Sequence, residues 1–125
     1  MSEALLALAE DLARRAGDVA REGRARGMRV VGTKLTDTDM VTVFDREAEA
    51  TIVAGLRAAR PDDSIVGEEG GQHRGTSGIE WHVDPIDGTT SFMYGLPTWC
   101  VSIGARDAHG SLVGAVYMPD LGELF

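Results

Sequence analysis

The sequence predicts an α+β fold in which two amino-terminal helices are layered on a mainly antiparallel sheet. Two stretches with apolar residues at helical spacing come first, and short strand-like runs fill the remainder of the chain. Residues 107–110 are compact enough for a hairpin, which favours antiparallel pairing of the strands on either side. Helices that precede the strands, rather than alternate with them, indicate an α+β layer arrangement.

The first predicted helix begins near Ser2, whose side-chain oxygen can cap free backbone amides. Its apolar stripe consists of Leu5, Leu8, Leu12, Ala16 and Val19. Gly23 and Gly27 raise the free energy of continuing the helix, so we expect it to end there. Residues 29–31 then read as a short extended piece.

The second predicted helix begins at Thr42-Val43-Phe44-Asp45, which resembles a capping box with Asp in place of the usual Glu. Its apolar stripe consists of Phe44, Ala48, Ile52 and Leu56. Arg60-Pro61 closes it, because proline cannot continue a helix.

Short strand-like runs follow at residues 64–66, 81–83, 101–104 and 112–117. Residues 119–122 read as a turn, and residues 123–125 read as the first part of a return strand. If the chain ended there, it would leave an unpaired apolar edge.

Composition and charge restrict the class of function. The chain has 125 residues, 43% hydrophobic and 26% charged, which fits one domain, residues 1–125. The formal net charge of −8 disfavours binding to nucleic acid or to an anionic membrane. Cys100 is the only cysteine, and the short apolar run at Leu5-Leu6 lacks the flanks of a signal peptide or membrane span. We therefore expect a cytoplasmic protein.

The segment richest in chemistry is 81–90, where a β-rich run ends in two carboxylates, Asp84 and Asp87. Pro85 biases Asp84 toward an extended backbone, so the two acids can be held near one another. Two carboxylates ~4 Å apart repel by about 1 kcal/mol in water and about 4 kcal/mol at a protein-like dielectric. A divalent cation relieves this repulsion, and oxygen-only ligands favour Mg²⁺ over zinc or copper.

Residues on either side of this segment extend the candidate site. Gly88 allows close backbone approach, and Thr89 offers a hydroxyl and an amide that suit an oxyanion such as phosphate. Upstream, the glycine-rich turn 67–71 carries two acids, one of which could complete a metal site. A polar segment from Lys34 to Asp45 reads as a mobile flap. The competing interpretation of Asp84 and its neighbours is a turn chosen for backbone geometry.

The sequence Asp84-Pro85-Ile86-Asp87-Gly88-Thr89, together with Gly67-Glu68-Glu69, resembles the signature pair of the inositol monophosphatase family. The probability that five fixed residues, each at about 5% usage, match by chance at a given place in a sequence is roughly 3 × 10⁻⁷. Residues 34–45 and 95–104 also resemble the family, so the resemblance covers almost the whole chain. It implies the first part of an αβαβα sandwich phosphatase fold.

The resemblance also implies a set of metal ligands. Glu68 and Asp84 would bind a first Mg²⁺ together with the carbonyl of Ile86. Asp84 and Asp87 would bind a second Mg²⁺, so that Asp84 bridges the two ions.

The remaining roles follow from the same resemblance. Glu68 and Thr89 would orient the attacking water, and the backbone amides of Gly88 and Thr89 would hold the phosphate. Lys34 and Asp45 would lie near a weaker third metal site. The family's second half carries a Trp-Asp-x-Ala-Ala-Gly-like motif whose Asp binds metal and substrate, and these 125 residues do not contain it.

The function that the resemblance implies is Mg²⁺-dependent hydrolysis of a small phosphate monoester by metal-activated water. The expected substrate is a small phosphorylated polyol, inositol monophosphate first, and the resemblance suggests a homodimer and sensitivity to lithium. A related phosphatase acting on histidinol phosphate, a fructose bisphosphate or an adenosine bisphosphate is the alternative enzyme. A non-catalytic metal-binding or interaction protein is the alternative from another class. Because the second half is absent, we expect the 125 residues alone to bind Mg²⁺ weakly and to turn over slowly.

Overall fold

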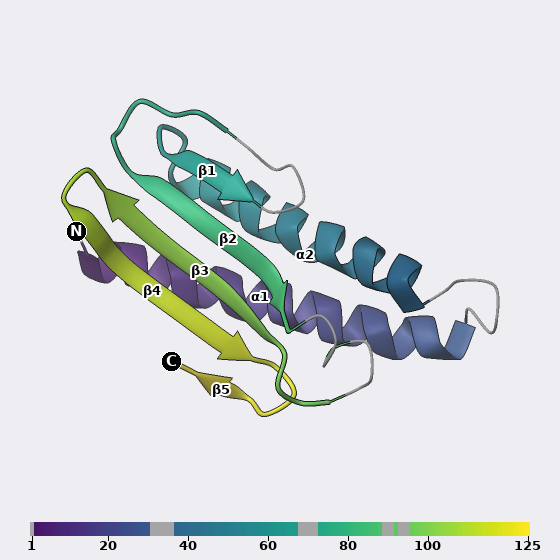
Figure 1. Ribbon diagram of the computed structural model, residues 1–125. Helices are drawn as coiled ribbons and strands as arrows, with labels where there is room; N and C mark the ends of the chain where they lie inside the picture. Colours follow the sequence, from purple (N-terminus) through teal and green to yellow (C-terminus); the bar gives the residue numbers. More distant parts are fainter. Residues whose placement is uncertain (1, 31–36, 68–72, 89–91, 93–95) are drawn as a thin grey trace.

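The structure of the chain is a computed structural model that describes residues 2–30, 37–67, 73–88, 92 and 96–125. Two helices come first, followed by five strands. Their bounds are α1 Ser2–Val30, α2 Asp37–Ala59, β1 Ser64–Gly67, β2 Glu80–Asp87, β3 Cys100–Asp107, β4 Gly110–Met118 and β5 Glu123–Leu124. Both helices pack on the same face of the sheet, α1 across β2, β3 and β4, and α2 against β2 (Figure 1). The predicted α+β layer arrangement is confirmed.

The sheet has the strand order β1-β2-β3-β4-β5. β1 pairs with β2 in parallel, and every other neighbouring pair is antiparallel, as a mainly antiparallel prediction requires. The predicted hairpin joins β3 to β4, with Gly110 at a φ of +132°. The predicted turn after β4 contains Gly122 at a φ of +66°, and β5 returns beside Met118.

The core lies between the helices and the sheet. On α1 the buried hydrophobic residues are Leu5, Ala9, Leu12, Ala13, Ala16 and Ala20, and on α2 they are Phe44, Ala48, Ile52 and Leu56. From the sheet, alternate residues such as Trp81, Val83, Val101 and Ile103 point into the same core. Most of α1's buried positions are alanines, which lets the helix lie close to the sheet. Of the predicted α1 stripe, Leu8 and Val19 are half-buried.

Two predicted helix ends are wrong. α1 continues through Gly23 and Gly27 to Val30, so residues 29 and 30 are helical and not extended. A Cβ at Gly23 would come within 2.9 Å of the Phe44 ring, so this glycine is required by the contact with α2. Packing of this kind outweighs the ~1 kcal/mol propensity penalty of a mid-helix glycine.

α2 begins at Asp37, five residues before the predicted cap at Thr42. The sequence ahead of Thr42 contains two further aspartates, and acidic residues favour the first turn of a helix through its dipole. Asp45 therefore lies within the helix and not in its first turn. No described helix is at once long and apolar enough to span a bilayer.

Candidate functional site

The two predicted metal-binding aspartates lie on β2 opposite neighbouring residues of β3. Asp84 pairs with Ser102, and Asp87 pairs with Cys100. Three positions separate the aspartates along β2, whereas two separate their partners along β3, so β2 carries one extra residue here. This irregularity is a β-bulge formed around Pro85 and Ile86.

The bulge decides which way Asp87 points. Side chains of a regular strand alternate between faces, so residues three positions apart would lie on opposite faces. The extra residue restores the alternation, and Asp84 and Asp87 share the face of Ser102 and Cys100, since paired residues of antiparallel strands lie on one face. The prediction that the β-rich run ends in the two acids is confirmed, since both lie in the last four residues of β2.

Pro85 lies beyond the described pairing of β2 with β1. Among the described residues, β1 pairs with β2 only as far as Val83, so no described pairing with β1 requires an N–H donor from Pro85. Pro85 and Ile86 are both buried, which anchors the bulge in the core. Ile86 thus lies between the two aspartates, and metal binding by its carbonyl stays a prediction.

Cys100 borders the acids, a position that no sequence pattern predicts. Its Sγ lies 4.0 Å from Asp87 Oδ2 and 4.0 Å from Ser102 Oγ. Burial raises the pKa of the Cys100 thiol, the Ser102 hydroxyl lowers it, and the charges of Asp87 and Asp84 raise it, with a net increase. The thiol is therefore protonated at neutral pH, and its pKa depends on the charges of both carboxylates.

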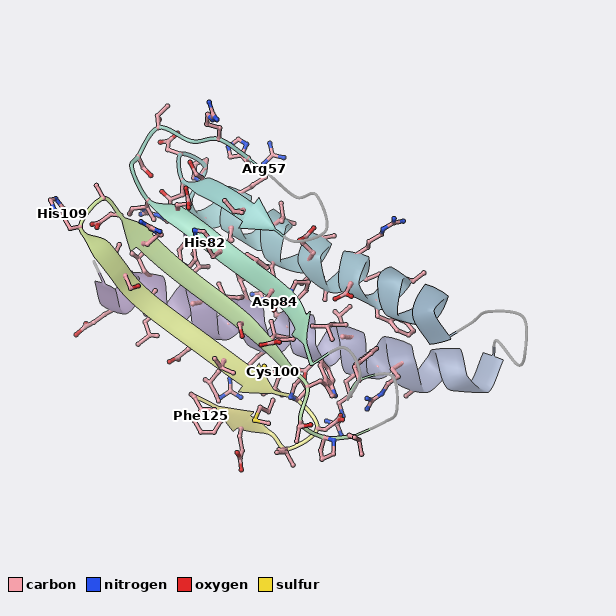
Figure 2. The ribbon with its side chains drawn as sticks, in the orientation of Figure 1. Arg57, His82, Asp84, Cys100, His109 and Phe125 are labelled. Carbon is pink, nitrogen blue, oxygen red and sulfur yellow. The ribbon has the colours of Figure 1, made fainter. Side chains whose placement is uncertain are left out.

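The residues around Asp84 form the open face of the sheet, on the side away from the helices. Figure 2 shows His82, Asp84 and Cys100 on this face. A groove of about 450 Å³ runs across it, and its lining includes His82, Asp84, Ser102, Gly104 and Val116. His82 Nε2 lies 2.5 Å from Glu80 Oε1, but both side chains are exposed and such pairs contribute little to stability.

Gly88 follows the second aspartate and has a backbone that only glycine adopts readily. Its φ is +83°, and a Cβ added to it would lie 3.3 Å from the Cα of Trp99. Its carbonyl accepts a 3.0 Å hydrogen bond from the Phe92 N–H. The backbone of Gly88 therefore lies close to the backbone of Trp99, which is the close approach that this glycine allows.

The donor set fits a hard divalent cation in part. Asp84 and Asp87 supply carboxylate oxygens on one face, which Mg²⁺ prefers, and Asp84 Oδ1 is shielded from solvent. Within the described residues, no three His, Cys, Asp or Glu side chains form a group that could hold a metal. A third acid would have to come from elsewhere, and the predicted one, Glu68, lies outside the described residues.

The predicted site residues therefore fall into three groups. Asp84, Ile86, Asp87 and Gly88 are consecutive or nearly so at the end of β2. Thr89 and Lys34, like Glu68, lie outside the described residues. Asp45 is buried on α2, and its place near a third metal stays a prediction.

Comparison with known proteins gives a consistent match. A family model described as the inositol monophosphatase family matches residues 1–125. Among curated relatives, the Nus factor SuhB of Pasteurella multocida is 40% identical over 122 residues, 97% of this chain and 46% of that protein. The histidinol-phosphatase of Chlorobaculum parvum is 40% identical over 120 residues, covering 96% and 46%. Inositol monophosphatase 1 of Solanum lycopersicum is 39% identical over 127 residues, covering 98% and 46%.

Solved structures share the fold. The extragenic suppressor protein suhB of Bartonella henselae superposes with a TM-score of 0.83 at 31% identity, covering 98% of this chain and 47% of that one. An inositol monophosphatase from Anabaena (Nostoc) sp. PCC 7120 gives 0.78 at 32% identity, covering 98% and 43%. The chain thus spans about half the length of the proteins it matches.

Proposed function

Because this chain belongs to the inositol monophosphatase family, we propose that it forms the amino-terminal part of a magnesium-dependent phosphatase acting on a small phosphate monoester. The observation that carries the proposal is the bulge in β2, which brings Asp84 and Asp87 to one face immediately before Gly88. Inositol monophosphate is the substrate we favour, since an inositol monophosphatase is among the relatives.

The proposed mechanism assigns a task to each predicted residue. Glu68, Asp84 and the Ile86 carbonyl would hold a first Mg²⁺, and Asp84 and Asp87 would hold a second. When bound at these residues, Mg²⁺ would supply two effects: a lower pKa for the attacking water and stabilisation of negative charge on the leaving oxygen.

The remaining residues act on water and phosphate. Glu68 and Thr89 would orient the attacking water, and the Glu68 carboxylate would accept its proton. The backbone amides of Gly88 and Thr89 would bind the phosphate oxygens, and Gly88, directly after the second acid, has a positive φ of +83°. Lys34 and Asp45 serve a weaker third metal.

Two other functions have support among the relatives. The histidinol-phosphatase relative favours histidinol phosphate as a second candidate substrate. The Nus factor relative favours an interaction role with or without catalysis. A fructose bisphosphate and an adenosine bisphosphate complete the substrate panel.

The test uses the full-length protein and measures phosphate release from the four esters with Mg²⁺ and with a chelator. Asp84→Asn and Asp87→Asn should each lower the rate by at least ~100-fold, because the metal contributes several kcal/mol and about 1.4 kcal/mol is tenfold. Glu80→Gln is the matched control, since this exposed acid lies on the same strand and should leave the rate unchanged. Full Mg²⁺-dependent activity in Asp84→Asn would sink the proposal.

A further inference from the structure

The side chain of Arg24 on α1 joins two distant parts of the chain. Its Nη1 donates a 3.2 Å hydrogen bond to the Phe92 carbonyl. Its Nη2 donates bonds of 3.1 and 3.0 Å to the two carboxylate oxygens of Asp120. The Arg24 and Asp120 side chains are only 16% and 14% exposed, so these charge-assisted bonds are partly shielded from water.

The same guanidinium also contacts two aromatic rings. It lies 5.0 Å from the ring centre of Phe92 and 5.6 Å from that of Trp99. Trp99 Nε1 donates a 2.8 Å bond to the same Asp120 carboxylate, and the two rings meet edge to face at 4.8 Å. Phe92 and Trp99 both belong to the connection between β2 and β3, so Arg24 fixes this connection at two points.

Phe92 and Trp99 both contact the backbone of Gly88. The Phe92 N–H donates to the Gly88 carbonyl at 3.0 Å, and the Gly88 backbone runs beside Trp99, with the ideal Cβ position 3.3 Å from the Trp99 Cα. A shift of either aromatic residue would therefore move Gly88. The aspartates are held differently, because the pairing of β2 with β3 sets the positions of Asp84 and Asp87.

We propose that Arg24 is a positioning residue that sets the Gly88 backbone for phosphate binding by acting through Phe92 and Trp99. The inference rests on the proposed function, because it takes the amide groups at Gly88 to hold phosphate. It follows that Arg24 controls affinity for the phosphate group and not affinity for Mg²⁺.

Substitutions that change the hydrogen-bonding shape of the Arg24 side chain can distinguish a positioning role from a purely structural one. Arg24→Lys keeps the positive charge beside Asp120 but loses the planar fork that reaches Asp120 and the Phe92 carbonyl at once. Arg24→Met removes every donor and keeps much of the apolar packing. Arg21→Met is the matched control, because Arg21 also approaches Asp120, at 3.7 Å, but is mostly exposed and lies on the same helix.

The experiment uses the full-length protein and the ester that it hydrolyses best. We expect both Arg24 variants to raise KM, and the inhibition constant of inorganic phosphate, by about tenfold, the effect of losing one hydrogen bond to a charged group. The Mg²⁺ concentration for half-maximal activity should stay unchanged. Amide hydrogen exchange in residues 88–99 should become faster in both, and Arg21→Met should match the wild type in every measurement.

An unchanged KM in both Arg24 variants of an active enzyme, with only a lower melting temperature, would overturn the positioning role and leave the proposed function intact. Absence of phosphate release by the wild-type protein from all four esters would overturn the proposed function and this inference with it. A parallel rise in the Mg²⁺ requirement would also overturn the inference, since it would mean that the aspartates had moved.

Discussion

The indole Nε1 of Trp81 donates a 2.9 Å hydrogen bond to the carboxylate of Asp63, and both side chains are buried in the core. The same carboxylate accepts bonds of 2.7 Å from Arg60 Nε and 2.7 Å from Ser77 Oγ. Asp63 thus ties the end of α2 to β2 and to the segment that precedes β2.

Replacing Asp63 should weaken the whole fold. Asp63→Ala leaves the buried indole N–H of Trp81 without its acceptor and removes the partner of Arg60, and we expect the free energy of unfolding to fall by about 3 kcal/mol. Urea denaturation monitored by tryptophan fluorescence measures this loss. Asp62→Ala is the control, because the neighbouring side chain is exposed and should change stability by less than about 0.5 kcal/mol. Equal effects of the two substitutions would contradict this prediction.

The contribution of Asp63 should depend on pH. Burial by itself would raise the pKa of Asp63, but the hydrogen bonds from Arg60, Ser77 and Trp81 and the Arg60 charge lower it below its ordinary value of 3.8. A lowered folded-state pKa means that the stabilisation is complete above the unfolded-state value and is lost as the pH falls below it. The difference in unfolding free energy between the wild type and Asp63→Asn should therefore shrink as the pH falls below 3.8. A constant difference down to strongly acidic pH is the contrary outcome.

Gly88 and Gly110 provide a matched pair for separating strain from function. Both have a positive φ, +83° and +132°, so alanine at either should destabilise the protein by about 1–2 kcal/mol. Only Gly88→Ala should also raise KM for the phosphate ester, because Gly110 lies in the hairpin between β3 and β4. Thermal unfolding and steady-state kinetics on both variants test this. A similar KM rise in Gly110→Ala would show that lost stability alone explains the kinetics.

Cys100 can report on the charges of the candidate metal site. In protein freed of metal by a chelator, its thiol should ionise above its ordinary pKa of 9.0, because burial and the charges of Asp87 and Asp84 all oppose the thiolate. Asp87→Asn should lower that pKa, whereas Asp107→Asn at the far end of β3 should not. Thiolate absorbance followed against pH gives the result. If Asp87→Asn leaves the titration unchanged, the carboxylate does not lie beside the thiol.

Much of the fold was predictable from the local pattern. Apolar stripes on both helices, the hairpin at 107–110 and the turn at 119–122 depend on residues close in sequence, and the structure confirms them. The end of α1 was not predictable, because the glycine at position 23 is required by its contact with Phe44 on the other helix and does not mark a helix end. The roles of Glu68, Thr89 and Lys34 stay predictions.

The candidate site was predictable in composition but not in geometry. The spacing of Asp84 and Asp87 identified two acids that belong together, yet a strand without a bulge would separate them onto opposite faces. Nothing local reveals which strand carries an extra residue, because the bulge exists only relative to β3. The contact between Arg24 and Asp120 could not be predicted from local sequence either, because 96 positions separate these residues.

The packing of α1 against β4 has a consequence for synthesis on the ribosome. Asp18 on α1 accepts a hydrogen bond from the hydroxyl of Tyr117 on β4, 99 positions later, and Gly17 lies against Pro119. At about 5–20 residues per second, some 5–20 s pass between the appearance of the helix and that of its partner strand. The nascent chain must therefore carry the β4-facing side of α1 uncovered for that time, so this side of the helix is available to chaperones until β4 has been made.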